Sequence, residues 1–193
     1  MISFNKNFMR KIFLFMMVSL DGYFEGVGHD LSWHNVDAEF NAFAHEQNIG
    51  PVGTLLFGRT TYELMAGYWP KPAGAVDDPE TARFMNETPK VVASTEPFAP
   101  DWQGTTVVSA NVIEEIEKLK AGPGKEIAIF GSNKLCVSLM EKGLVDEFRV
   151  MVNPVAIGAG TPLFAGLDKR YKFKLIKTRQ FSSGNVLLTY VPA

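Results

Sequence analysis

Residues 55 to 63 read Leu55-Leu56-Phe57-Gly58-Arg59-Thr60-Thr61-Tyr62-Glu63, an apolar run that reaches a glycine and continues into a helix-favouring segment. This order predicts a buried strand, a tight turn and a helix start, with Thr60 and Glu63 at capping-box spacing. The free N–H groups at such a helix start, with Arg59 and the threonine hydroxyls, form a candidate phosphate site. An ordinary glycine turn with a solvated arginine explains the same pattern equally well.

Other apolar runs bounded by turn residues predict further strands. The full set of predicted strands is 11–19, 53–58, 90–94, 105–109, 126–130, 145–153, 172–181 and 185–191. Most of these runs are continuous rather than alternating, which is typical of strands covered on both faces. They therefore predict an α/β fold of three layers, with a mainly parallel central sheet and helices on both faces.

Helical patterns fall between these strands, and several have recognisable start signals such as Pro79 and Asn111. The predicted helices are 36–48, 60–67, 79–87, 111–121 and 132–142. Residues 69–79 form the longest irregular stretch, as a lid or a surface loop. The last two strands are joined by the polar segment Ser182-Ser183-Gly184-Asn185, which predicts a C-terminal antiparallel hairpin.

Length and charge narrow the class of protein. The 193 residues suit one buried domain, which we place at residues 10–193 after an N-terminal extension of residues 1–9. A net charge of −2 gives no field that would attract nucleic acid or an anionic membrane, so small molecules are the expected ligands. The apolar run 12–18 follows basic residues but lacks a small-residue cleavage site and is shorter than the ~20 residues of a membrane span. We therefore expect a buried first strand in a cytoplasmic protein.

The cysteine and histidine content predicts no metal site. Cys136, the only cysteine, lies in an apolar helical pattern and is interpreted as core, with a reactive thiol beside Lys134 as the alternative. His29, His34 and His45 are not spaced as ligands with a cysteine or an acidic partner.

Two more strand ends run into small or hydroxyl-bearing residues. Phe130-Gly131-Ser132-Asn133 offers a second turn for a phosphate, although Ser132 also suits a simple N-cap. Ser94 and Thr95 offer hydroxyls for a ribose phosphate, or form an ST-turn. Ligands of open α/β sheets bind outside the carboxyl ends of the strands, where all three turns fall.

Together, these segments resemble the dihydrofolate reductase-like superfamily. They are most similar to stand-alone relatives of the C-terminal reductase domain of the bifunctional riboflavin-biosynthesis deaminase-reductase. The matching segments are Ser19-Leu20-Asp21-Gly22, Gly58-Arg59-Thr60-Thr61-Tyr62-Glu63, Ser94-Thr95, Phe130-Gly131-Ser132, Leu144-Val145-Asp146-Glu147-Phe148 and Pro154-Val155-Ala156-Ile157-Gly158-Ala159-Gly160-Thr161-Pro162-Leu163-Phe164. The resemblance covers residues 9–191, and its last segment is the most specific for the riboflavin branch.

The resemblance implies NADPH bound across the carboxyl edge of the sheet. Arg59 and Thr60 would hold the pyrophosphate or an adenosine phosphate, while Ser94 and Thr95 would lie near the 2′-phosphate. The implied cofactor residues are Val18, Ser19, Gly58, Arg59, Thr60, Thr61, Ser94, Thr95, Phe130, Gly131, Ser132 and Asn133. Val18 and Ser19 would border the nicotinamide. The family has a glycine pair where this chain has Gly131 and Ser132. The serine side chain would narrow the space through which the pyrophosphate approaches the backbone.

The substrate side is less defined. Trp33 before Asp37 and Glu39 is loosely similar to the tryptophan and pterin-binding carboxylate of dihydrofolate reductase, with the spacing shifted by one residue. Asp37 also suits a first-turn helix acid. Tyr68 and Trp69, which end the helix predicted to start at Thr60, are candidate walls of the substrate site, with core packing as the alternative. Tyr62 is a further candidate substrate-binding residue.

The expected function is reduction of a C=N or C=O carbon of a small heterocyclic or sugar-imine substrate by NADPH. Asp21, Glu39 or water would supply the proton, although Asp21 also suits a turn. The riboflavin resemblance implies reduction of a ribosylamino-pyrimidine. Dihydrofolate reductase activity and a non-catalytic NADPH sensor are the alternatives, and the family often forms homodimers.

Overall fold

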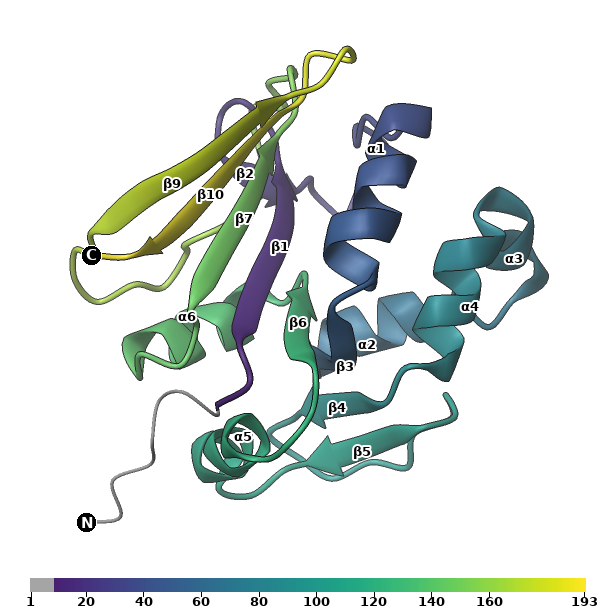
Figure 1. The fold of residues 1–193 in the computed structure, drawn as a ribbon, viewed down its shortest axis with the longest axis vertical. Helices are drawn as coiled ribbons and strands as arrows, with labels where there is room; N and C mark the ends of the chain where they lie inside the picture. The colour runs from purple at the N-terminus through teal and green to yellow at the C-terminus, as the bar shows by residue number, and fades with distance from the viewer. Residues whose placement is uncertain (1–8) are drawn as a thin grey trace.

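The computed structural model describes residues 9–193, apart from the side chains at positions 47 and 48. Nearly all of the expected N-terminal extension therefore lies outside the described residues. A central twisted sheet runs through the molecule, with helices packed on both of its faces (Figure 1).

The main sheet has eight strands in the order β5-β4-β3-β6-β1-β7-β10-β9. The strands are β1 (Ile12–Val18), β3 (Val52–Gly58), β4 (Lys90–Ala93), β5 (Thr105–Val108), β6 (Glu126–Phe130), β7 (Glu147–Val152), β9 (Phe173–Gln180) and β10 (Val186–Pro192). The first six are mutually parallel, and β10 pairs antiparallel with both β7 and β9. The expected α/β class, with a mainly parallel sheet and a C-terminal antiparallel hairpin, is confirmed.

Side chains of the sheet alternate between two packed layers. Ile12, Leu14 and Met16 of β1 join the core cluster that packs against α5 (Val112–Ala121) and α6 (Asn133–Glu141). Phe13 of the same strand points into the opposite layer, which contains residues of α2 (Arg59–Ala66) and α4 (Pro79–Glu87). Because successive side chains of a strand face opposite ways, a continuous apolar run fills both layers, and the three-layer prediction is confirmed.

The helices differ from the sequence prediction in two places. The predicted helix 36–48 is an α-helix, α1 (Ala38–Phe43), that continues as a π-helix, η2 (Ala44–Ile49). The stretch 69–79, predicted to be irregular, contains the short helix α3 (Pro72–Asp77). Pro72 lies in its first turn, where the missing proline N–H has no helical partner to lose.

Three predicted helix starts also need correction. Helix α2 begins at Arg59 after an extended Gly58, so Thr60 lies within the helix and the capping-box prediction is wrong. Asn111 and Ser132 precede α5 and α6, but both adopt left-handed backbone angles and neither side chain caps its helix. Pro79, by contrast, lies in the first turn of α4 as predicted.

A second, two-stranded sheet was not predicted. It pairs β2 (Tyr23–Glu25) with β8 (Thr161–Pro162), bringing the segment after β1 against the family-specific stretch near residue 160. Gly160, at φ +153°, lies so close to Glu25 that an added Cβ would be 2.1 Å from the Glu25 carbonyl oxygen. Only glycine fits this approach, which explains the glycine at that position of the motif.

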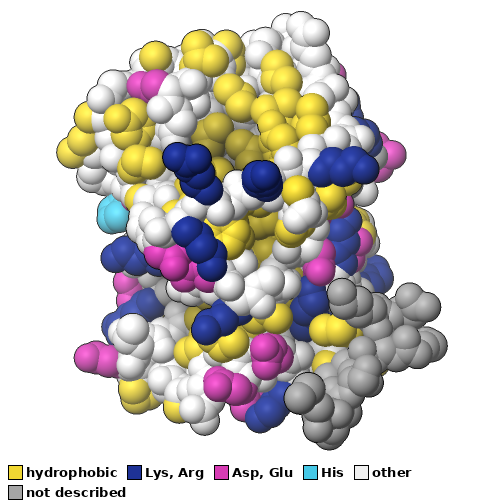
Figure 2. Space-filling view, turned by 90° about the vertical axis from the view of Figure 1, so that its left-hand side faces the viewer, with side chains coloured by type: hydrophobic (Ala, Val, Ile, Leu, Met, Phe, Trp, Pro, Cys, Tyr) yellow, Lys and Arg dark blue, Asp and Glu magenta, His cyan; other side chains and the backbone are white. Residues whose placement is uncertain are grey.

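The edge strand β9 carries exposed apolar side chains. Leu175 and Ile176 are 46% and 50% exposed. Apolar side chains gather in the upper part of the face on that side of the molecule, with lysines and arginines among them (Figure 2). No helix within residues 9–193 is long and apolar enough to cross a membrane.

Candidate functional site

Three of the predicted turns meet at one edge of the sheet. Strand β3 pairs with β4 on one side and β6 on the other, so Gly58 at the end of β3, Ser94 after β4 and Gly131 after β6 lie at the ends of neighbouring parallel strands. The helix after β3 leads toward β4, whereas the helix after β6 leads toward β7 on the far side of β1. The crevice between the ends of β3 and β6 is therefore a topological switch point, where open α/β sheets bind ligands.

A buried serine fastens the turn after β3 to the turn after β6. The Gly58 N–H donates to Ser132 Oγ at 2.8 Å, and Ser132 is 7% exposed. Gly131 and Ser132 both have positive φ, +80° and +65°. The serine that replaces the second family glycine thus adopts the conformation a glycine would favour, and its hydroxyl binds the neighbouring turn.

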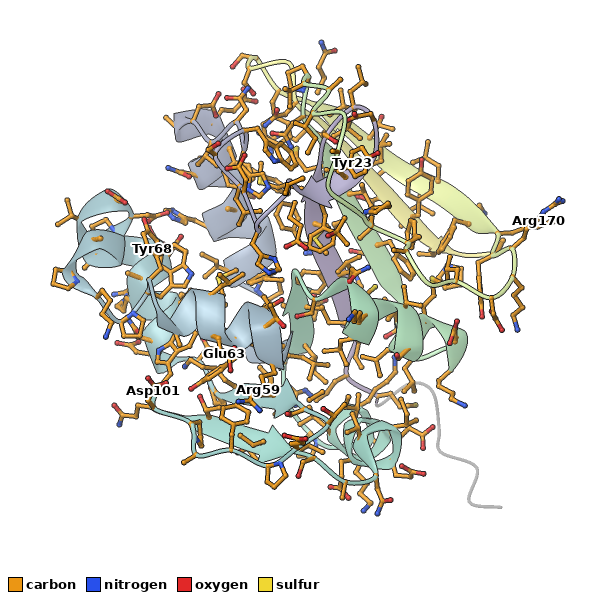
Figure 3. All side chains as sticks on the ribbon, turned by 180° about the vertical axis from the view of Figure 1, so that it is seen from behind. Tyr23, Arg59, Glu63, Tyr68, Asp101 and Arg170 are labelled. Atoms are coloured by element: carbon orange, nitrogen blue, oxygen red, sulfur yellow. The ribbon has the colours of Figure 1, made fainter. Side chains whose placement is uncertain are left out.

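Helix α2 presents its N-terminus and two polar side chains at this edge. Arg59 and Thr60 are exposed, and the first-turn N–H groups have no helical acceptors. Arg59 pairs with Glu63 at 2.8 Å, and its guanidinium lies 4.8 Å from the centre of the Phe98 ring. Figure 3 shows Arg59 and Glu63 side by side on this helix. An exposed pair of this kind is weak, so an incoming phosphate can compete for the arginine.

The other predicted cofactor residues differ in what their side chains contact. Ser94 forms the ST-turn alternative, donating to the Glu96 carbonyl at 2.7 Å, while Thr95 is exposed. Ser19 is buried at the end of β1, where its hydroxyl accepts from the Tyr23 N–H at 3.0 Å. Asn133 is buried and donates to the Pro162 carbonyl at 3.4 Å.

A cavity of about 730 Å³ lies beside these turns. Thr61 and Gly131 belong to its wall, and a Cβ at Gly131 would be only 3.0 Å from Thr61 Cγ2. Its lining residues are Phe15, Met16, Met17, Phe24, Glu25, Leu31, His34, Val36, Phe40, Asn41, Ala44, Ile49, Thr61, Leu64, Met65, Tyr68, Trp69, Asp77, Asp78, Thr81, Phe84, Met85, Phe130 and Gly131. The cavity is therefore built from the strands β1, β2 and β6, from five helical segments (α1, η2, α2, α3 and α4) and from the loop that precedes α1.

The structure distributes the predicted substrate residues over several places. Trp69 lines the cavity, and its indole N–H contacts Met65 Sδ at 3.2 Å. Tyr62 is only 2% exposed, in the core beside Trp102. Asp37 caps α1, accepting from the Phe40 N–H at 2.7 Å, which is the helix-terminus alternative. Trp33 lies outside the lining and donates to the Asp30 carbonyl at 3.1 Å.

The two predicted acids also lie outside the cavity lining. Asp21 accepts from the Gly158 N–H at 2.8 Å, and hydrogen bonds from Ser19 and Gly158 lower its pKa. Glu39 accepts from the Ser182 N–H and hydroxyl at 2.8 and 2.7 Å, and these bonds lower its pKa. Both carboxylates are therefore held in the ionised form, and their catalytic roles stay predictions.

The sequence interpretation missed most of the cavity wall. His34 is the main polar omission, because it lines the cavity and its Nε2 is buried without a hydrogen-bond partner. Burial lowers the pKa of His34, although a hydrogen bond to the Phe24 backbone partly offsets this. The adjacent Trp33 was selected from the sequence instead, because a tryptophan before a helix is similar to the substrate-site tryptophan of dihydrofolate reductase.

The structure also shows the environment of the cysteine and the distribution of the side chains that could bind a metal. Cys136 is buried in the core as predicted, and burial raises its thiol pKa to about 12. Within residues 9–193, no three histidine, cysteine, aspartate or glutamate side chains gather as metal ligands.

Comparison with known proteins finds similarity over nearly the whole chain. The family model of the RibD C-terminal domain matches residues 10–187. The Bacillus subtilis protein YyaP is 34% identical over 183 residues, which cover 94% of each chain. A second Bacillus subtilis protein, YwjB, is 28% identical over 184 residues, covering 95% of this chain and 99% of its own.

Solved structures share the fold at low sequence identity. A Shewanella sp. PV-4 protein named for riboflavin biosynthesis has a TM-score of 0.71 at 22% identity, covering 95% of this chain and 99% of that one. The Thermotoga maritima diaminohydroxyphosphoribosylaminopyrimidine deaminase/5-amino-6-(5-phosphoribosylamino)uracil reductase has a TM-score of 0.68 at 16% identity. This chain matches 58% of that protein's length with 97% of its own.

These matches agree with the resemblance inferred from the spaced motifs, and with the dihydrofolate reductase-like α/β fold. The family match extends from the first residue of the expected domain, residue 10, to the start of the last strand, at residue 187. By its sequence over nearly its whole length, the chain belongs to the RibD C-terminal domain family.

Proposed function

We propose that this protein is an NADPH-dependent reductase that transfers a hydride to a C=N or C=O carbon of a small heterocyclic or sugar-imine substrate. The main support is that Thr61 and Gly131 belong both to the polar turns and to the wall of the apolar cavity. A ligand with a phosphate-bearing end and a flat uncharged end would contact both surfaces at once. A dinucleotide has this chemistry.

The donor groups at the polar turns suit the phosphates of such a cofactor. We assign them to the free N–H groups at the start of α2 and to the side chains of Arg59, Thr60 and Thr95. Gly131 has no side chain to obstruct the ring end, and Phe130 supplies an apolar surface beside it. When bound, the dihydronicotinamide supplies the hydride, because no protein side chain carries that chemistry.

The chain's own contribution is to orient the substrate and exclude water. The apolar wall, including Phe15 and Phe84, keeps solvent from the reacting carbon. Reduction of a C=N bond forms one C–H and one N–H bond, so a proton must arrive as well. Asp21 and Glu39 are held ionised outside the cavity, and we therefore assign the proton to water rather than to either acid.

Reduction of a ribosylamino-pyrimidine, as named for the Thermotoga maritima relative, is the first candidate reaction. Reduction of a dihydrofolate is the second. A sensor that binds NADPH without turnover is the alternative from a different class. Loss of NADPH absorbance with any candidate substrate would support a reductase, whereas tight NADPH binding without turnover on all of them would support the sensor.

Two further expectations remain proposals. A homodimer is expected from the family resemblance, and the exposed Leu175 and Ile176 on edge strand β9 provide apolar surface for one. A cytoplasmic location is expected from the sequence. Sedimentation of the purified protein and fractionation of cells would measure these.

A thermal-shift experiment with NADPH and NADH tests the cofactor assignment. NADPH at 100 times its Kd should stabilise the protein by about 2.7 kcal/mol. Arg59→Ala should weaken NADPH binding about tenfold or more, because it removes a charge-assisted hydrogen bond. Arg83→Ala is the matched control, since Arg83 is an exposed arginine on α4.

The possible outcomes test the role of Arg59 separately from the proposed reductase function. Lack of any shift with either nucleotide would contradict the proposed reductase. A shift that is equal in wild type and Arg59→Ala would remove only Arg59 from the site. Equal losses in Arg59→Ala and Arg83→Ala would indicate a general effect of charge.

A further inference from the structure

The cavity beside Thr61 and Gly131 has a wall of aromatic and flexible apolar side chains. Five phenylalanines and four methionines line it, contributed by strands and helices on all of its sides. Aromatic faces contact planar rings over a large area, and methionine adapts its shape to the ligand. The wall therefore favours a flat, largely apolar occupant.

The rim of the cavity is apolar as well. Leu31, Val36, Leu64 and Tyr68 all line the cavity, yet they are 40%, 52%, 45% and 37% exposed. Large apolar side chains left in contact with water at a concave site are typical of ligand-binding surfaces. A ligand that covered them would gain free energy from burial of this area.

The charged residues of the wall are all acidic. No lysine or arginine lines the cavity, among the side chains that the structure describes. The wall contains Glu25, Asp77 and Asp78, and each carboxylate already has a polar partner. A phosphate ester carries one to two negative charges near neutral pH, so it would be repelled here without a compensating cation.

His34 adds no positive charge to this wall. Burial lowers the pKa of His34 and so favours the neutral imidazole, although a hydrogen bond with the Phe24 backbone partly offsets this. Its Nε2 is buried without a hydrogen-bond partner, so the ring does not offer a cation to a phosphate in the cavity.

We propose, on the basis of the reductase function above, that the compound reduced in this cavity is an uncharged planar heterocycle without a phosphate ester. It would thus differ from the 5-amino-6-(5-phosphoribosylamino)uracil named for the Thermotoga maritima relative. When the cofactor and this compound are bound together, all of the phosphates belong to the cofactor, which places them at the start of α2. The reducible compound occupies the side of the site that lacks cations.

A matched pair of ligands tests this inference. Calorimetric titration would compare a ribosylamino-pyrimidine with its phosphate ester, and would include an uncharged dimethyl dihydropterin, each with and without NADP⁺. The uncharged compounds should bind at least about tenfold more tightly than the ester, because the ester is repelled by the acidic wall. Tighter or equal binding of the ester, or no binding of either uncharged compound, would overturn the inference.

A variant that adds a positive charge to the cavity wall provides a second test of this inference. Leu64→Arg should raise the affinity for the phosphate ester about tenfold, because it supplies the missing cation at the rim. Val76→Arg is the control, since Val76 is 78% exposed on α3 and outside the lining. Equal behaviour of the two variants would contradict the assignment of the ligand to this cavity. Failure of NADP⁺ to bind, with normal binding of the uncharged compounds, would contradict the proposed reductase only.

Discussion

The polar turns after β3 and β6 and the cavity beside them share two residues but differ in chemistry. The turn after β3 offers free N–H groups, exposed Arg59 and exposed Thr60. The cavity offers aromatic and aliphatic side chains, with carboxylates as its only charged groups among the described side chains. Thr61 and Gly131 form the boundary. This contrast indicates that the cofactor and the substrate, when bound together, have their negative charge at the polar turns and their uncharged rings in the cavity.

The largest expected effect is at the boundary itself. Gly131→Ala places a Cβ 3.0 Å from Thr61 Cγ2 in a left-handed backbone, so Gly131 and Thr61 must move apart. The contact calls for a shift of a few tenths of an ångström between Gly131 and Thr61, where the polar turns meet the cavity. In addition to the backbone cost, we expect this shift to weaken NADPH binding by about tenfold or more. Fluorescence titration with NADPH measures it.

Gly143→Ala is the control for this prediction. Gly143 has φ +69° but nothing within 4 Å of an added Cβ, so the variant has a similar backbone cost without the contact. Both variants should lose about 1–2 kcal/mol of stability, and only Gly131→Ala should lose nucleotide affinity. If the two bind NADPH equally well, Gly131 does not separate the two regions.

A smaller effect is expected from the link between the two polar turns. Ser132→Ala removes the acceptor of the Gly58 N–H and should lower the free energy of unfolding by about 1–3 kcal/mol, as measured in urea. Ser138→Ala, on the exposed face of α6, should be nearly neutral. Equal stability of these variants would show that the hydrogen bond contributes little to joining the turns.

The smallest effect concerns the cavity side and depends on pH. The pKa of His34 is lowered in the folded state, so the unfolded chain binds its proton first as the pH falls. Stability should therefore decrease below about pH 6.5, by up to about 1.4 kcal/mol per pH unit, until the folded-state pKa is passed. Thermal unfolding of His34→Gln should have a flatter pH profile than wild type or the exposed control His29→Gln. A profile as steep in His34→Gln would show that His34 is not a buried neutral group.

The sequence predicted the main strands well because each is an apolar run long enough to be recognised locally. Strand β6, for example, was predicted with its observed bounds, 126–130. The pairing of β2 with β8 was missed because three- and two-residue strands have no periodicity of their own. Helix α3 was missed because its proline and glycine, with Pro70 and Pro79 on either side, resemble a loop.

The two regions of the site were predictable to different degrees. The polar turn lies in one continuous segment around Arg59, where strand, glycine and helix start are consecutive. The cavity wall, by contrast, combines side chains as distant in sequence as Phe15, His34 and Phe84. No local pattern distinguishes these from core residues, and the aromatic Tyr62, which was predicted to contact substrate, is in fact buried elsewhere.

By itself, the sequence determined the α/β class, the positions of the main strands along the chain and the polar turn around Arg59, because each depends on residues adjacent in the chain. The tertiary structure alone decided which face each side chain occupies. It turned Ser132 toward Gly58 and Glu39 toward Ser182, and it gathered an apolar cavity without lysine or arginine among its described side chains. Such choices depend on packing between distant segments, whose relative positions no local pattern specifies.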